Sequence, residues 1–150
     1  MSVRADAPAA LGQRCEMKFH HGAVSVPDLA ASIAWWQDKL GFALDWSAYM
    51  DVIPAKIAVM RRGDLRIELF ECPTAAPLPE GRSHPDSDAR THGTKHVCFA
   101  VKDVHALMDD LKSRGVDIVF IKDVPNNVVA YIRDNAGNLF EFCQQPDLWA

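Results

Sequence analysis

The sequence predicts an α+β fold in which one structural unit is used twice. The first observation is a repeated phrase: HHGAVSVPDL (20–29) returns as KHVCFAVKDV (95–104), with a histidine, a valine, an aspartate and an aliphatic residue at matching places. The second is that both copies close alike, because LRIELFECP (65–73) and NLFEFCQQP (138–146) each place a glutamate five residues before a proline. A repeat on this scale indicates two copies of one supersecondary unit.

Each repeated phrase is followed by a segment with the signals of an amphipathic helix. Asp28 and Asp103 stand where an N-cap is expected. The helices should end at the glycines of KLGF (39–42) and SRGV (113–116), where a left-handed residue is common. The apolar residues that should form one buried face are Leu29, Ile33, Trp36 and Leu40 in the first helix and Val104, Leu107, Met108 and Leu111 in the second.

Strand-like runs follow each helix. In the first copy KIAVM (56–60) and LRIELF (65–70) flank a tight turn. In the second copy VDIVFIK (116–122), VVAYI (128–132) and LFEF (139–142) are separated by turns that contain Pro, Asn and Gly. With the strand before each helix, the predicted unit is βαβββ.

The chain of 150 residues has the length of one domain. A segment rich in Pro, Ser and Asp separates the two units and is expected to be a loop. The expected parts are a flexible tail (1–16), a single domain (17–146) made of module one (17–73), the loop (74–94) and module two (95–146), and a C-terminal tail (147–150).

Composition excludes several classes of function. The net charge is −4 and basic residues are not clustered beyond Arg61 and Arg62, which argues against nucleic acid as a partner. No apolar run approaches the roughly 20 residues that span a bilayer, so a membrane location is not expected. The four cysteines show no CxxC pairing, and a chain of this size does not need disulfides. We therefore expect free thiols and a cytoplasmic location.

His21 and His96 are equivalent in the repeat, and so are Glu68 and Glu141. Two neutral imidazoles and two carboxylates suit one divalent ion of zinc, nickel, cobalt, manganese or iron. A single strand histidine is most often an ordinary core or surface residue. The coincidence of two His/Glu pairs related by pseudo-symmetry, however, indicates that all four side chains converge on one metal site.

The doubled module resembles the vicinal oxygen chelate superfamily, which includes glyoxalase I, methylmalonyl-CoA epimerase, extradiol dioxygenases, and fosfomycin- and bleomycin-resistance proteins. The resemblance covers residues 17–146 and includes YIRDNAGNLFEF (131–142). It implies two βαβββ modules in a curved, eight-stranded mixed sheet around a metal cleft, and commonly a homodimer. It also implies the metal ligands His21, Glu68, His96 and Glu141, while Tyr131 occupies a common family position where packing is the simpler interpretation.

The resemblance leaves three kinds of function open for a small-molecule substrate. The first is a metal-dependent isomerase or lyase of the glyoxalase and epimerase type, which forms a metal-stabilised enolate or enediolate with Glu141 or Glu68 as the catalytic base. The second is an Fe(II) extradiol-type dioxygenase, which would leave Glu68 idle. The third is a drug-binding protein without catalysis.

Three basic residues are candidate substrate contacts. Lys56 lies where epimerase-like members carry an additional base. Arg82 and Arg90 lie on the loop, which is either a solvated linker or a lid that brings an arginine to an anionic part of the substrate.

Overall fold

Both βαβββ modules are present in the computed structural model, which describes residues 17–149. The expected N-terminal tail (1–16) lies outside the described residues. The first module consists of β1 (Gly22–Ser25), α1 (Leu29–Leu40), β2 (Ala43–Met50), β3 (Ala55–Arg62) and β4 (Leu65–Glu71). The second consists of β5 (Val97–Val101), α3 (Val104–Ser113), β6 (Asp117–Val124), β7 (Asn127–Arg133) and β8 (Leu139–Gln144).

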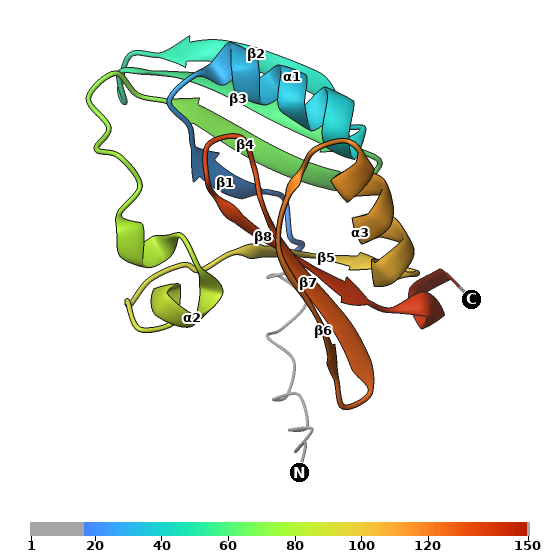
Figure 1. Cartoon of the computed structure of the whole chain (residues 1–150). Coiled ribbons are helices and arrows are strands. Elements are labelled where there is room, and N and C mark those ends of the chain that lie inside the picture. The colour runs from blue at the N-terminus through green and yellow to red at the C-terminus, as the bar shows by residue number, and fades with distance from the viewer. Residues whose placement is uncertain (1–16, 150) are drawn as a thin grey trace.

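The eight strands form two four-stranded sheets, one in each module, and the predicted α+β fold of two βαβββ modules is confirmed (Figure 1). The first sheet has the order β1-β4-β3-β2, and the second repeats it as β5-β8-β7-β6. The pairs β1/β4 and β5/β8 are parallel and the others are antiparallel, which makes both sheets mixed. Among the described residues no strand of one sheet pairs with a strand of the other. The modules meet through the side chains of a shared apolar core.

The helices begin where the sequence predicts. A side-chain oxygen of Asp28 accepts a hydrogen bond from the Ala31 amide at 2.9 Å, and Asp103 does the same for Ala106 at 2.9 Å. Each bond satisfies one amide that has no partner within the helix. Gly41 ends α1 in the left-handed region with φ 66°. None of the helices that the structure describes is long and apolar enough to cross a membrane.

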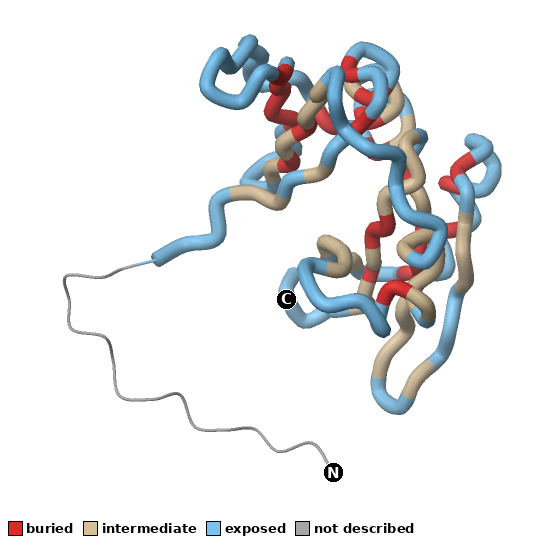
Figure 2. The backbone as a smooth tube through the Cα atoms, turned by 90° about the vertical axis from the view of Figure 1, so that its left-hand side faces the viewer, coloured by how far each residue is buried: buried red, intermediate tan, exposed pale blue. Residues whose placement is uncertain are grey.

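One apolar core joins the modules. Trp36 of α1 is fully buried, and its ring centroid lies 4.9 Å from that of Phe42 and 4.9 Å from that of Phe140 in β8. Asn135 in the β7–β8 turn also donates a hydrogen bond to Ser32 of α1 at 3.1 Å. The buried stretches run through both modules, whereas much of the connecting chain is exposed (Figure 2).

The strand that the sequence did not reveal is β2. All of its residues are exposed, and its pairing with β3 shifts register between Leu44 and Trp46. A bulge of this kind inserts one extra residue into the strand, so each side chain after it points to the face opposite to the one that regular alternation predicts. The alternation of apolar and polar residues is therefore broken within ALDWSAYM (43–50), and the pattern does not read as a strand.

Between the modules runs a linker, residues 72–96, that contains the short helices η1 (Glu80–Arg82) and α2 (Pro85–Asp88). After β8 the chain ends in a 3₁₀ turn, η2 (Pro146–Trp149), which occupies most of the expected C-terminal tail (147–150).

Candidate metal centre

Each sheet has one face packed on its helix and one face turned away, which we call the open face. In the first sheet Ile67 and Leu69 of β4 belong to the core, so Glu68 between them points to the open face. His21 precedes β1, which runs beside β4 with Ala23 opposite Glu68. Nε2 of His21 lies 3.3 Å from Oε2 of Glu68, and Nδ1 of the same ring lies 2.7 Å from Nδ1 of His20.

The second sheet repeats this arrangement. Phe140 and Phe142 of β8 belong to the core, and Glu141 between them points to the open face. His96 precedes β5, whose Cys98 is opposite Glu141. Nε2 of His96 lies 2.8 Å from Oε2 of Glu141. The repeat in the sequence therefore becomes two His/Glu pairs at equivalent places.

The His–Glu separations are those of hydrogen-bonded ion pairs and are also compatible with two ligands on one ion. Bonds of about 2.1 Å place two neighbouring ligand atoms roughly 3.0 Å apart in octahedral and 3.4 Å apart in tetrahedral coordination. The observed separations of 3.3 and 2.8 Å fall near these values. The exposed fractions of the side chains are 35% and 15% for His21 and Glu68 and 27% and 18% for His96 and Glu141, so each pair is reachable from solvent.

The two pairs do not meet within one chain. In the part of the chain that the structure describes, no three His, Cys, Asp or Glu side chains are grouped so that they could hold a metal ion. Each pair lies on its own sheet, and the sheets are separate. The expected convergence of four side chains on one point is therefore not seen within the described part of one chain, which carries two separate His/Glu pairs.

Tyr131 lies beside the second pair and was expected only to pack. Its hydroxyl is 3.3 Å from Nε2 of His96, and the two rings meet edge to face with centroids 5.0 Å apart. Burial and the neighbouring Glu141 carboxylate raise the pKa of Tyr131. The hydroxyl therefore keeps its proton at neutral pH and can donate a hydrogen bond. In the first sheet the equivalent position, opposite Glu68, is Val59.

Comparison with known proteins identifies the family to which the chain belongs. The model of the Glyoxalase/Bleomycin resistance protein/Dioxygenase superfamily matches residues 18–142. The chain belongs to this superfamily. The superfamily contains the doubled βαβββ module that the sequence indicates, and the resemblance to vicinal oxygen chelate proteins is thereby confirmed.

Proteins similar to this chain in sequence or in structure match it over most of its length. The uncharacterized Escherichia coli (strain K12) protein YaeR is 33% identical over 107 residues, which are 71% of this chain and 78% of YaeR. A glyoxalase family protein from Enterococcus faecalis superposes with a TM-score of 0.71 at 17% identity, over 85% of this chain and 97% of that chain. The fosfomycin resistance protein FosX from Listeria monocytogenes, whose crystal structure contains Mn(II) and sulfate, has a TM-score of 0.60 at 20% identity, over 87% of this chain and 94% of FosX.

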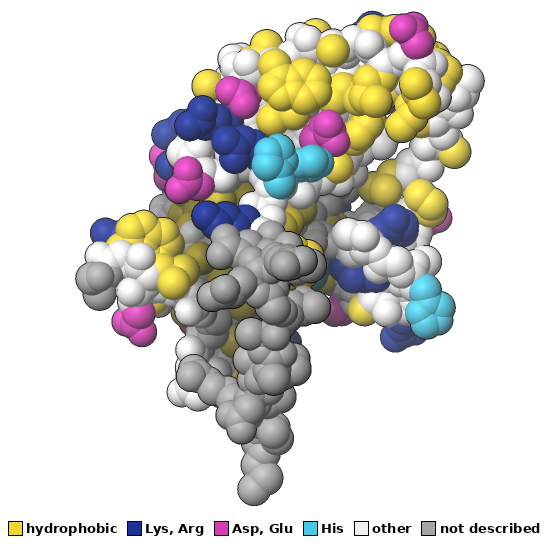
Figure 3. Space-filling view, turned by 180° about the vertical axis from the view of Figure 1, so that it is seen from behind, with side chains coloured by type: hydrophobic (Ala, Val, Ile, Leu, Met, Phe, Trp, Pro, Cys, Tyr) yellow, Lys and Arg dark blue, Asp and Glu magenta, His cyan; other side chains and the backbone are white. Residues whose placement is uncertain are grey.

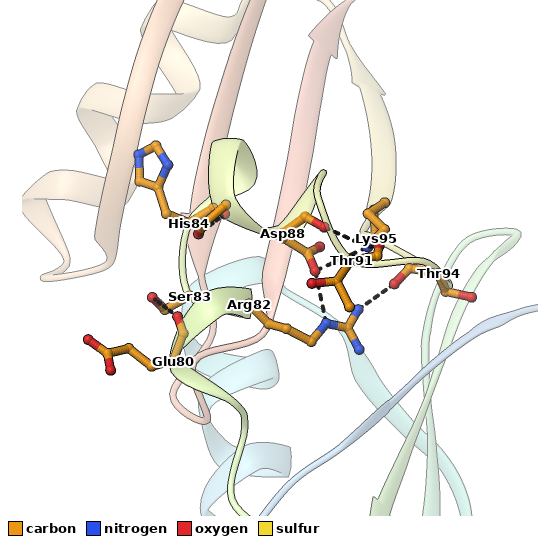
Figure 4. Close-up of polar contacts among 9 residues, drawn as sticks. Glu80, Arg82, Ser83, His84, Asp88, Thr91, Thr94 and Lys95 are labelled. Atoms are coloured by element: carbon orange, nitrogen blue, oxygen red, sulfur yellow. Dashed lines mark hydrogen bonds and ion pairs between the residues drawn. The ribbon is translucent and has the colours of Figure 1, made fainter.

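In this superfamily member, Arg82 is held by a buried carboxylate (Figure 4). Its Nε donates to Oδ1 of Asp88 at 2.9 Å, and Lys95 reaches the same oxygen at 3.3 Å. Asp88 is only 2% exposed. Burial alone would raise its pKa, but the hydrogen bonds and charges of Arg82 and Lys95 outweigh burial and lower it. Arg82 and Lys95 also donate to the carbonyls of Thr94 and Thr91, so the cluster fixes the linker.

The linker rests on the open face of the second sheet. Arg133, which shares that face with Tyr131, donates from Nε to the carbonyl of Ser83 at 2.7 Å. The rings of His84 and Phe120 lie 6.1 Å apart. Arg90, the other loop arginine expected to contact substrate, is exposed, and no hydrogen bond or ion pair of its side chain is found among the described residues.

A cavity of about 850 Å³ lies between the linker, β1 and the β7–β8 turn. Its wall includes Arg82, Lys95 and His96, so it reaches the second His/Glu pair from the side of the linker. A volume of this size is within the usual range of small-molecule sites.

Lys56 lies apart from both His/Glu pairs, and its contact with substrate stays a prediction. It is opposite Glu71 in the β3–β4 ladder, and its Nζ lies 2.6 Å from Oε1 of Glu71. Glu71 in turn accepts from the Leu29 amide at the start of α1 at 2.8 Å. Because side chains alternate along a strand, Glu71 and Lys56 point to the helix side of the sheet, away from Glu68.

Proposed function

We propose that the protein is a divalent-metal-dependent isomerase or lyase of the glyoxalase and epimerase type, acting on a small substrate with neighbouring oxygen atoms. The observation that carries this proposal is the presence of two His/Glu pairs on equivalent strands, at a spacing compatible with two ligands on one ion. His21, Glu68, His96 and Glu141 would hold the ion. The bound Mn(II) of the structurally similar FosX is consistent with such a donor set. When bound, the metal acts as a Lewis acid that makes a carbon-bound proton beside the chelated oxygens removable near neutral pH.

The protein's own residues supply the acid–base groups. A carboxylate oxygen of Glu141 or Glu68 accepts the proton from carbon and returns it, because each is half-buried and directed at the site. The Tyr131 hydroxyl, which burial keeps protonated, donates a hydrogen bond beside His96 and Glu141.

We further propose that the complete site is formed by a homodimer, with one pair from each protomer. Neither pair alone completes a four-ligand site, and the open face of the first sheet is rich in exposed apolar residues. Trp46 is 47% exposed and Met50 is 37% exposed, on an edge strand that has a free side. Such a strand is usually covered in the assembled protein. When the first open face of one protomer packs against the second open face of its partner, the His21/Glu68 pair of one protomer meets the other protomer's His96/Glu141 pair.

Metal content tests the proposal directly. Elemental analysis of natively purified protein should find about one divalent ion per chain, since a dimer contains two complete sites. The variants Glu68→Gln and Glu141→Gln should each lose more than about 90% of it, because a neutral amide is a poor ligand in place of a carboxylate. Glu71→Gln is the matched control, since Glu71 lies in the same strand as Glu68 but on the helix side. Unchanged metal content in both site variants would contradict the proposal.

The reaction is tested by a substrate screen. Two-oxoaldehyde adducts and acyl-CoA esters represent the isomerase and lyase class, and catechols represent the dioxygenase alternative. Turnover of a catechol with oxygen uptake, and of none of the others, would replace the proposed reaction by ring cleavage.

A further inference from the structure

Two arginines face each other on the open face of the first sheet, beside the His21/Glu68 pair. Arg61 of β3 is opposite Arg66 of β4, and two residues further along the same ladder Val59 is opposite Glu68. Because side chains two apart on a strand share a face, Arg66 points the same way as Glu68, and Arg61 the same way as Val59.

The charge of Arg66 has no partner in the described part of the protein. The side chain is half-buried, and no hydrogen bond or ion pair of its guanidinium is formed with any described residue. Arg61 donates from Nε to the Gly63 carbonyl at 3.0 Å, and its nearest carboxylate oxygen, on Asp45, is 4.0 Å away. Like charges directly opposite each other in a ladder destabilise a sheet, and partial burial of a guanidinium without a partner adds to that cost.

The second module shows what a paired arginine looks like at the same place. Arg133 is the repeat equivalent of Arg61, and it lies opposite Leu139 rather than opposite another arginine. Arg133 donates to a carboxylate oxygen of Asp117 at 2.8 Å and to the Ser83 carbonyl at 2.7 Å. The unpaired charge is therefore specific to the first module and does not follow from the fold.

The aromatic side chain of Trp46 lies on the same open face as the two arginines. Trp46 of β2 is opposite Val59, so Glu68, Val59 and Trp46 form one row across the open face. α1 lies in front of the first sheet in Figure 1, and the view from behind in Figure 3 looks onto the opposite side of the molecule. There, hydrophobic side chains gather beside Lys/Arg and His side chains (Figure 3).

We propose that Arg66 and Arg61 form a subsite for a carboxylate group of the substrate, whose apolar part lies against Trp46. This inference rests on the proposed function, in that it names the substrate class of the same site: an aromatic or aliphatic carboxylic acid that also carries chelating oxygens. A guanidinium presents a planar fork of N–H donors that matches a carboxylate, and an anion bound between two facing guanidiniums offsets their mutual repulsion.

The test uses metal-free protein, so that its outcome is independent of the metal site. Benzoate, a carboxylate with an apolar body, is titrated into the full-length chain by calorimetry and by ¹⁵N-resolved NMR, with benzamide as the neutral probe of equal shape. Wild-type protein should bind benzoate and shift the amide signals of β3 and β4, and should bind benzamide at least about 10-fold more weakly.

Three variants assign the binding to the arginines. Arg66→Met should weaken benzoate at least about 10-fold, and Arg66→Lys should weaken it less, because lysine keeps the charge without the fork. Arg62→Met is the matched control: Arg62 is in the same hairpin but donates to the Leu40 carbonyl on the helix side, so benzoate binding should be unchanged.

Equal binding of benzoate and benzamide, or an Arg66→Met variant that binds benzoate like wild type, would overturn the subsite. If Arg66→Met does not fold, Arg66→Lys together with the benzamide comparison decides the same question. If metal-free protein binds benzoate through Arg66 but the natively purified protein contains no metal, the proposed function is contradicted and the subsite is not.

Discussion

The open faces of the two sheets carry equivalent His/Glu pairs in different surroundings. Around His96 and Glu141 lie the Tyr131 hydroxyl and a linker held by Arg133. Around His21 and Glu68 lie the exposed Trp46 and the unpaired Arg66. The repeat has preserved the candidate ligands in both copies, while the neighbours have diverged. We infer that the second face has become the rigid half of the site and that the first face contacts substrate and a partner subunit.

The largest effect is expected from the cluster that fixes the linker to the second module. Asp88→Asn removes a buried charge that pairs with Arg82 and Lys95, and should lower the free energy of unfolding by about 3 kcal/mol at pH 7. That value is the lower end for a broken buried pair, since Arg82 is 35% exposed and Lys95 27%. Asp86→Asn, an exposed residue in the same helix, is the control and should change stability little.

The pH dependence of this difference follows from the lowered pKa of Asp88. A carboxyl whose pKa is lower in the folded than in the unfolded state stabilises the fold above its unfolded pKa of about 3.9. The stabilisation is lost as the pH falls through the folded pKa. Chemical denaturation of wild type and Asp88→Asn should therefore show the full difference at pH 6–8, a difference that begins to shrink near pH 4 and disappears below the folded pKa of Asp88. A constant difference across this range would mean that the charge of Asp88 is not the cause.

A smaller effect is expected at the first face. Trp46→Lys should raise the dissociation constant of the homodimer by about 30-fold, as for an interface residue worth about 2 kcal/mol. Sedimentation velocity across micromolar concentrations measures it. Trp149→Lys is the matched control, because Trp149 is 48% exposed and Trp46 47%. A wild-type chain that stays monomeric, or equal weakening by both variants, would remove the first face from the interface.

The smallest effect is expected from the hydroxyl that distinguishes the second pair. Tyr131→Phe keeps the ring on His96 but removes the hydroxyl that lies beside the Glu141 carboxylate, and should weaken metal binding by about 10-fold, as for other groups that orient a ligand. Competition with a chelator measures the affinity. Tyr49→Phe, on an exposed tyrosine of β2, should leave it unchanged. If the two variants are alike, Tyr131 only packs.

Much of the fold could be predicted from the sequence because its signals are local. The N-caps at Asp28 and Asp103 and the left-handed Gly41 depend on a few neighbouring residues, and the structure contains all three. The pairing of His21 with Glu68 and of His96 with Glu141 followed from the repeat. The strand β2 was missed because its bulge interrupts the alternation on which a strand is recognised.

The rest of the site depends on tertiary contacts that no local pattern reveals. The sequence could not tell that Arg82 would be held by Asp88, or that the two pairs would stay on separate sheets. Two signals were present and overlooked. Arg66 and Glu68 are two residues apart in β4 and therefore share a face. Glu68 and Glu71 are three residues apart and therefore lie on opposite faces, and Lys56 is on the face of Glu71, which it is opposite in the ladder.

The central claim, that one metal site takes a His/Glu pair from each of two chains, is tested most directly by mixing two inactive variants. One chain carries His21→Ala and Glu68→Ala, and the other carries His96→Ala and Glu141→Ala. Each alone should bind almost no metal. After unfolding and refolding together, the mixed dimer has one complete site and one site with no ligands, so purified heterodimer should contain about one metal ion per two chains. Heterodimer that binds no more metal than either variant alone would contradict a shared site.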